Sequence, residues 1–195
     1  MLRRTAIAAA CTACAGCGWM FPDDRDVPDA VREQFAGMAE MPIGAPGQDC
    51  EILVDRTRLV ATEADGGAAP MKWFLAPTSD GGYWETTARV NEDGELVGGG
   101  GGGGGCGPIP GRDEDDLWWS GGIGSDSEVV HGGHAPAGSE RVRLYFGDHE
   151  PVLIDVEDDG YFLVVLDESA CCEWSYPDSI EALDADGEVM ASVNP

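Results

Sequence analysis

The chain has 195 residues, with 37 acidic residues against 11 Lys and Arg, and a formal net charge of −26. A charge this negative repels phosphate backbones and anionic lipid head groups, which disfavours binding to nucleic acids and to membrane surfaces. The length suits one domain or two very small ones. A hydrophobic content of 43% is too high for a wholly disordered acidic chain.

The N-terminus has the layout of an export signal. Arg3 and Arg4 precede an uncharged stretch that ends at Asp23. Basic residues followed by the short, Ala-rich segment 5–16 are typical of a secretory signal peptide. The paired arginines also permit the twin-arginine route. A transmembrane helix would need about 20 strongly apolar residues, so we expect an exported protein without a membrane-spanning anchor.

Three cysteines lie in this segment, at positions 11, 14 and 17. The Cys-Ala-Gly-Cys stretch at 14–17 resembles a bacterial lipobox, although Cys14 stands where the family has an aliphatic residue. The resemblance implies lipidation of Cys17, with 1–17 as signal peptide and lipobox, and a diacylated cysteine anchors a protein stably. Cys11 is a second candidate for lipidation. The rival interpretation, a metal or iron–sulfur ligand run, lacks the polar surroundings that thiolate ligands need.

Residues 18–47 form an acidic, Pro-rich segment. Val31, Phe35 and Met38 recur there at i, i+4 and i+7, which places them on one face of a short helix. Pro28 suits the first helical position and Asp29 favours the helix N-terminus. The sequence therefore predicts a tether that carries one amphipathic helix.

Residues 48–195 contain β-branched and aromatic runs separated by turn signals every eight to twelve residues. This spacing is typical of sandwiches and barrels. We expect a mainly β fold, a small antiparallel β-sandwich or partly open barrel of hairpins, with one short N-terminal helix and long Gly-rich loops. The expected strands are 50–54, 58–62, 71–75, 83–90, 141–146, 152–156, 161–166, 180–183 and 188–192.

Eight consecutive glycines occupy positions 98–105, and Cys106 follows them. A phosphate-binding loop needs glycines at set spacings followed by Lys and Ser or Thr, and none of this is present. Glycine has no side chain to bury and loses the most entropy on ordering. The sequence therefore predicts a flexible Gly-rich loop at 98–107 that interrupts the β-rich domain. The segment 111–139 is also expected to be mostly loop.

Four cysteines remain after processing: Cys50, Cys106, Cys171 and Cys172. Export permits disulfides, and four cysteines allow three pairings. A bond between the vicinal pair would close a strained ring. Cys50–Cys106 is slightly favoured, and cross-links from these two cysteines to the vicinal pair stay open. We expect these cysteines to form disulfides that stabilise a small core, rather than a redox centre.

The sharpest metal-like pattern is His131-Gly132-Gly133-His134. Together with His149 it offers up to three imidazole ligands for zinc or copper. Because glycines hold ligands loosely, we expect solvated loop histidines instead. The acidic turns 91–94 and 184–187 lack the ligand spacing of a calcium loop. The acidic segments 113–116 and 157–159 could still bind calcium weakly, but a solvated acidic surface is expected. No metal and no cofactor is therefore expected.

The sequence contains none of the G-x-S-x-G, S-x-x-K or H-E-x-x-H motifs of hydrolases and zinc proteases. Paired carboxylates carry no information when 37 are available. Tryptophans at 73, 84, 118, 119 and 174 suggest a sugar-stacking platform, but aromatic residues of a β-sandwich are more often core. The sequence predicts no enzymatic activity.

The C-terminal region 140–193 is similar to uncharacterised exported proteins of high-GC Gram-positive bacteria. The similarity rests on the Arg-Val-Arg-Leu stretch at 141–144, the Asp-Gly-Tyr-Phe stretch at 159–162 and the segment 182–188. It implies a small β-rich extracytoplasmic domain and carries no catalytic residues.

These observations favour an exported binding or structural module at the cell envelope. We expect it to be lipid-anchored on the outer face of the cell membrane, or secreted, and to bind an envelope protein or ligand. One alternative is a divalent-metal-binding protein that uses His131, His134 and His149 or the acidic loops. Another is a hydrolase of envelope polymers, which requires a cleft with a His or a carboxylate beside the tryptophans. The acidic residues are spread along the chain, which suggests general solubility rather than a site.

Overall fold

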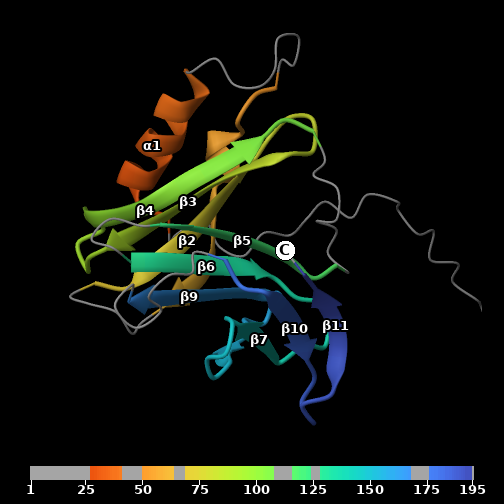
Figure 1. Ribbon diagram of the computed structural model, residues 1–195. Helices are drawn as coiled ribbons and strands as arrows, with labels where there is room; N and C mark the ends of the chain where they lie inside the picture. Colours follow the sequence, from red (N-terminus) through yellow and green to blue (C-terminus); the bar gives the residue numbers. More distant parts are fainter. Residues whose placement is uncertain are drawn as a thin grey trace, which may run out of the picture.

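The computed structural model describes residues 27–40, 50–63, 69–107, 116–123, 128–167 and 176–194. These residues form one α-helix, one 3-10 turn and three antiparallel sheets stacked in layers (Figure 1). The helix-side sheet consists, in order, of β1 (Arg58–Glu63), β2 (Met71–Pro77), β3 (Tyr83–Val90) and β4 (Leu96–Gly105).

Two further sheets complete the stack. The middle sheet has the order β5 (Trp118–Ile123), β6 (Glu128–His134) and β9 (Tyr161–Asp167). The outer sheet has the order β11 (Val189–Val193), β10 (Ser179–Leu183), β7 (Arg141–Tyr145) and β8 (Val152–Asp155). The expected sandwich-like, antiparallel β fold is therefore confirmed.

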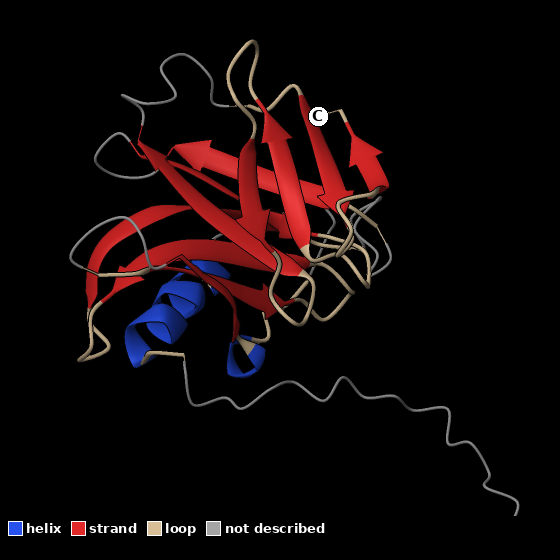
Figure 2. Cartoon of the chain, turned by 90° about the horizontal axis from the view of Figure 1, so that it is seen from below, coloured by secondary structure: helices blue, strands red, loops and turns tan. Residues whose placement is uncertain are grey.

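Helix α1 (Asp29–Ala39) covers the outer face of the helix-side sheet (Figure 2). Val31 and Phe35 are fully buried and pack against Phe74 and Ala88 of that sheet. The helical periodicity of the sequence thus correctly identified the buried face. Pro28 differs from the expectation, because it is the N-cap with an extended backbone rather than the first helical residue.

Strand β2 is buried on both faces. Neighbouring residues of a strand point to opposite sides, so Phe74 faces α1 while Trp73 faces the middle sheet. A second apolar layer, which includes Leu144, Phe162 and Ile180, fills the space between the middle and outer sheets. Burial on both faces explains why β2 is almost continuously apolar instead of alternating.

The helix-side and middle sheets approach each other at both edges, where β1 contacts β9 and β4 contacts β5. Polar side chains join the two sheets. Arg58 donates a 2.6 Å hydrogen bond to the Tyr161 hydroxyl group. Arg89 forms a 2.6 Å ion pair with Glu128, at the start of β6. These contacts fix how the two sheets lie relative to each other.

The glycine run corrects a sequence prediction. Instead of a flexible loop at 98–107, residues up to Gly105 belong to β4 and pair with β3. The pairing places Gly103 opposite Glu85 and Gly104 opposite Trp84. Backbone hydrogen bonds to a well-formed neighbouring strand hold glycines that have no strand preference of their own.

Segment 111–139 also differs from the expected loop. Strands β5 and β6 lie within it and form the centre of the molecule, with β6 paired to both β5 and β9. Segment 50–54 differs in the opposite sense: Ile52 makes an isolated bridge to Thr78, and a 3-10 turn η2 (Val54–Arg56) follows. The other expected strands appear within a few residues of their predicted bounds.

Among the described residues, no helix has the length and apolar character needed to cross a membrane.

Candidate ligand-binding cavity

A cavity of about 280 Å³ lies between the helix-side and middle sheets. Its polar side chains are Glu85, Thr87 and Ser120, and its apolar side chains are Trp73, Val130 and Leu163. Glycines of β4, β5 and β6 complete the lining. A small number of polar groups in an otherwise apolar hollow is the usual composition of a small-molecule site.

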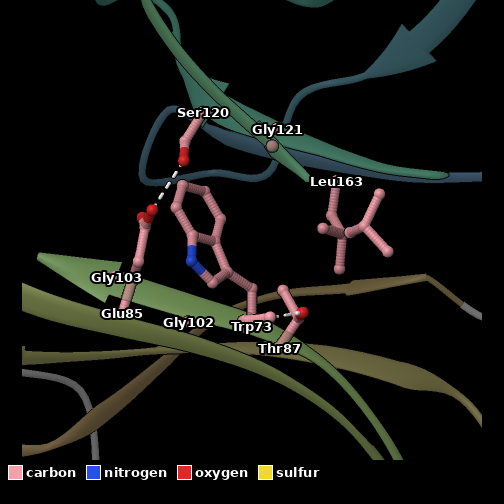
Figure 3. Close-up of a pocket in the computed structure, with 11 residues that line it drawn as sticks. Trp73, Glu85, Thr87, Gly102, Gly103, Ser120, Gly121 and Leu163 are labelled. Atoms are coloured by element: carbon pink, nitrogen blue, oxygen red, sulfur yellow. Dashed lines mark hydrogen bonds between the residues drawn. The ribbon is translucent and has the colours of Figure 1, made fainter. Parts of the chain in front are cut away.

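Glu85 is the one carboxyl group among the described residues that line the cavity. Its Oε1 atom accepts a 2.5 Å hydrogen bond from the Ser120 hydroxyl group, which reaches down from the opposite sheet (Figure 3). Its Oε2 atom is buried and has no hydrogen-bond partner among the described residues. The carboxyl group therefore keeps an unused polar atom within the protein.

Burial raises the pKa of Glu85 above its ordinary value, because removal from water disfavours the charged form. The Ser120 hydroxyl group, which donates to Oε1, and the nearby Trp73 indole N–H, which does not reach hydrogen-bond geometry with Oε2, oppose this rise without cancelling it. A carboxyl group whose ionisation is suppressed by its own surroundings is a recurrent feature of binding and catalytic sites.

Glycine leaves the β4 wall of the cavity bare. Gly103 shares the face of its partner Glu85, and a Cβ atom added at Gly101 or Gly103 would meet no atom within 4 Å. A side chain at either position would therefore extend into the hollow. The cavity exists in part because the sequence places no side chains there.

Two other glycines allow β4 to lie close to β3. A Cβ atom at Gly104, where φ is +152°, would lie 2.4 Å from the Tyr83 carbonyl oxygen. At Gly102 it would lie 2.5 Å from the carbonyl oxygen of Glu85. Because real side chains cannot approach so closely, these positions require glycine.

Trp73 forms a fixed wall beside Glu85 (Figure 3). Only 2% of this residue is exposed, and its ring packs edge-to-face against Trp118 and Tyr161 at centroid distances of 5.7 Å. A Cβ atom at Gly132 would lie 3.1 Å from the indole ring, so glycine makes room for it. The indole is held in place before any ligand arrives.

The structure does not bring together the three histidines that the metal-binding alternative requires. His131 and His134 lie three positions apart on β6, so their side chains point to opposite faces of the middle sheet. His131 packs against Phe146 and His134 packs against Tyr161. His149 is exposed in the turn between β7 and β8.

Both β6 histidines are buried, which corrects the expectation of solvated loop residues. His131 accepts a 3.1 Å hydrogen bond at Nδ1 from the Trp119 indole, and burial lowers its pKa to about 4. The intervening glycines have packing roles instead of giving flexibility. A Cβ atom at Gly133 would lie 2.4 Å from the ring of Phe162.

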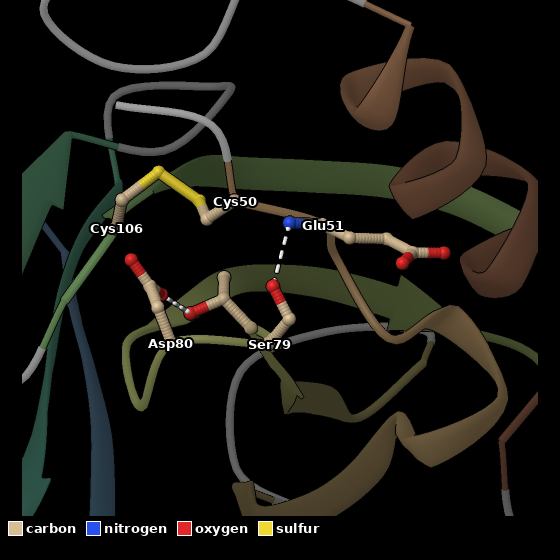
Figure 4. Close-up of a disulfide and its surroundings, with 6 residues drawn as sticks. Cys50, Glu51, Ser79, Asp80 and Cys106 are labelled. Atoms are coloured by element: carbon tan, nitrogen blue, oxygen red, sulfur yellow. Dashed lines mark hydrogen bonds between the residues drawn. A yellow bond between two sulfur atoms is a disulfide. The ribbon is translucent and has the colours of Figure 1, made fainter. Parts of the chain in front are cut away.

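Cys50 and Cys106 form a disulfide that joins the segment before η2 to the end of β4 (Figure 4). The favoured pairing of the sequence prediction is thus confirmed. Asp80 lies beside the two sulfur atoms. Hydrogen bonds from the Gly107 backbone and the Thr78 hydroxyl group lower the pKa of Asp80. Because the sulfur atoms are bonded to each other, this group offers no pair of thiolate ligands.

Several expectations concern residues outside those described. They are the signal peptide and lipobox with Cys17, most of the tether, and the cysteines Cys171 and Cys172. The acidic segment 113–116 also lies there except for Asp116. The acidic turn 157–159 is described and contributes to no cluster of three metal-ligating side chains in the described part of the chain.

Sequence reasoning missed the cavity residues Glu85, Thr87 and Ser120. The alternation within β3 places Glu85 and Thr87 on the same face, opposite Thr86 and Ala88. That alternation was visible in the sequence, but it does not say which face meets another sheet. The position of Ser120 depended on recognising β5, which was expected to be a loop.

The fold and the cavity define a layered antiparallel β protein with a small cavity between two sheets, mainly apolar and with a few polar groups. Comparison of the chain with models of protein families, with curated proteins and with solved structures found no match.

Proposed function

We propose that this protein is an exported, lipid-anchored module of the cell envelope that binds a small molecule in the cavity around Glu85. The observation that carries the proposal is a buried carboxyl group, with its Oε2 atom unpartnered among the described residues, in a hollow of about 280 Å³. Burying a polar group without a partner costs free energy. A bound ligand that supplies the missing hydrogen bond would recover that cost.

The arrangement of the walls supports binding. Trp73 is held by aromatic neighbours, and the bare β4 glycines keep the hollow open without any rearrangement. A site formed before the ligand arrives loses less entropy on binding. The proposal favours binding over hydrolysis of envelope sugars, because glycosidases generally use two carboxyl groups and the described lining offers Glu85 alone.

Export and anchoring are supported by the N-terminal sequence and by the disulfide. Arg3 and Arg4 precede an apolar segment that ends in the lipobox-like cysteine Cys17. The disulfide Cys50–Cys106 is typical of oxidising compartments outside the cytoplasm. With lipid on Cys17, the residues between Cys17 and α1 would tether the domain, of which α1 is a packed part, to the outer face of the cell membrane.

Membrane fractionation tests the anchor. In a bacterial host that lipidates exported proteins, Cys17→Ser should move the protein from the membrane fraction to the soluble exported fraction. Cys11→Ser serves as the matched control, since it alters the same segment without removing the proposed lipidation site. Unchanged partitioning of Cys17→Ser would refute the lipidation of this cysteine.

Blocking the cavity tests ligand binding. A fragment library of small amines, alcohols and acids can be screened by amide chemical-shift changes in NMR spectra. Fragments should shift the amides around Glu85 and Ser120. Gly103→Leu should abolish the shifts by filling the hollow, whereas Gly99→Leu should preserve them, because Gly99 lies outside the lining and also has open space at its Cβ position. A library without any binder at this site would contradict the proposal.

A further inference from the structure

We infer that the ligand of the Glu85 cavity is a small organic cation, bound through an ammonium or amidinium group that donates hydrogen bonds to Glu85. This inference rests on the proposed function and narrows it to one chemical class. It follows from the directions of the hydrogen bonds inside the hollow and from the charges that surround it.

The hydroxyl groups of the cavity have already used their protons. The Ser120 hydroxyl donates to Oε1 of Glu85 at 2.5 Å, and the Thr87 hydroxyl donates to the carbonyl oxygen of Gly101 at 3.3 Å. Each hydroxyl group has one proton, so the oxygen atoms retain only their acceptor sites. A ligand that meets these groups must therefore supply donors.

Glu85 adds the strongest acceptor when it is ionised. Its Oε2 atom is buried and unpartnered among the described residues, and no Lys, Arg or His occurs among the described residues of the lining. A neutral donor would leave the buried charge uncompensated, which is costly. A cation would neutralise the charge and form a charge-assisted hydrogen bond at the same time.

Two guanidinium groups between the helix-side and middle sheets are engaged elsewhere. Arg89, on the same face of β3 as Glu85, pairs with Glu128 and also donates to the Ala69 carbonyl oxygen at 2.6 Å. Arg58 donates to the Tyr161 hydroxyl group. These two arginines thus contact Glu128, Ala69 and Tyr161, and the carboxyl group of the cavity stays available to a ligand.

The size and the apolar walls limit the rest of the ligand. A volume of about 280 Å³ lies just below the usual range for small-molecule sites, which begins at about 300 Å³, so the ligand must be small. Trp73, Val130 and Leu163 provide apolar surface for a short hydrocarbon or aromatic portion. The net charge of −26 attracts cations to the protein as a whole and favours their encounter with the cavity.

A pair of matched probes tests the charge of the ligand. Benzylamine and benzyl alcohol have nearly the same size and shape, and only benzylamine is a cation at about pH 8. Isothermal titration calorimetry of the full exported domain should show at least about tenfold tighter binding of benzylamine. Glu85→Gln should remove this preference. Glu92→Gln, which removes the same charge from an exposed turn, should keep it.

Proton release provides an independent readout. Because burial raises the pKa of Glu85 in the free protein, a bound cation should displace its proton where the carboxyl group is partly protonated. The affinity for benzylamine should therefore rise with pH through this titration. Titrations in two buffers of different ionisation enthalpy measure the released protons, and Glu85→Gln should show no release from this site.

The outcomes separate the two proposals. Equal binding of the alcohol and the amine at the cavity would overturn the cation inference and leave the cavity as a binding site. Binding of neither probe would also overturn the inference. The proposed function itself would fail only if, in addition, no member of the fragment library shifted the cavity amides. Circular dichroism of Glu85→Gln and Glu92→Gln verifies that both variants are folded.

Discussion

The hydroxyl group of Ser120 donates a 2.5 Å hydrogen bond to Oε1 of Glu85 and thereby joins β5 to β3 across the space between two sheets. The two residues are 35 positions apart in the chain. The contact satisfies one oxygen of the carboxyl group and directs the other into the interior. The free-energy cost of burying a carboxyl group held in this way depends on pH, because only the ionised form is strongly penalised by burial.

Glu85→Gln should stabilise the protein at neutral and alkaline pH. Because the pKa of Glu85 is raised in the folded state, its stability contribution is present below the unfolded value of 4.5 and is lost as pH rises through the folded value. Gln keeps an acceptor for Ser120 and removes the buried charge. We expect a gain of roughly 1 kcal/mol in the free energy of unfolding above this titration.

Thermal unfolding across the pH range measures this effect. The gain should disappear under acidic conditions, where Glu85 is protonated in both states. Glu92→Gln, at an exposed position, should show no comparable pH dependence. A stability loss for Glu85→Gln at alkaline pH would show that the charged carboxylate is favourable where it lies.

Acidification should destabilise the protein through His131. Burial lowers the pKa of His131 from 6.5 to about 4 in the folded state, so the unfolded chain takes up the proton first. The free energy of unfolding should fall as pH drops from 6.5 to about 4, by up to about 3 kcal/mol from this residue. Denaturant titrations at a series of pH values measure the slope.

His131→Gln tests the assignment of that slope. Gln retains an acceptor for the Trp119 indole but does not titrate, so the slope between the two pKa values should be reduced. His149→Gln, at an exposed turn, should retain it. An identical slope in both variants would assign the acid sensitivity to other groups.

Two glycines of β4 should respond oppositely to alanine. Gly104→Ala should lower the free energy of unfolding by about 2 kcal/mol or more, because its Cβ atom would collide with the Tyr83 carbonyl oxygen. Gly99→Ala meets no atom within 4 Å and should raise stability by up to about 1 kcal/mol by restricting the unfolded chain. Chemical denaturation of both variants measures the contrast, and equal effects would contradict the packing of β4 on β3.

Removing the disulfide should weaken the fold substantially. Cys50 and Cys106 are 56 positions apart, and closing a loop of this length is worth about 4 kcal/mol in the chain-entropy description. The double variant Cys50→Ala/Cys106→Ala should lose stability of this order in denaturant titrations. Peptide mapping without reduction should recover the Cys50–Cys106 pair, and a link from either cysteine to Cys171 or Cys172 would contradict it.

Local patterns were sufficient for much of the fold. The spacing of Val31 and Phe35 identified the helix and its buried face, and the aromatic and β-branched run at 83–90, bounded by turn signals, identified β3. Turn signals located the C-terminal hairpin of β10 and β11. These elements could be predicted from the sequence because each depends on residues close together in the chain, whose periodicity or turn-forming residues indicate the local structure.

The structure of the glycine-rich segments could not be predicted from local patterns in the same way. Glycine has weak preferences of its own, so the conformation of 98–105 depends on the neighbouring strand β3. The burial of His131 likewise follows from a strand whose glycines make room for rings contributed by other parts of the chain. The polar, glycine-rich composition of these segments indicated loops. The residues that pack against them and hold them as strands lie far away in the sequence, so they could not be recognised from local patterns.

The sequence by itself determined the strong negative charge, the export-like N-terminus, the β-rich character and the local strands and helix, because these depend on composition and on short-range patterns. Only the tertiary structure decided that Glu85 and Ser120 meet, that the glycine run is an open wall, and that His131 and His134 are separated. The physical reason is that a site between two sheets depends on strand pairing and on the stacking of the layers. These bring together residues whose separation in the chain does not predict that they are in contact.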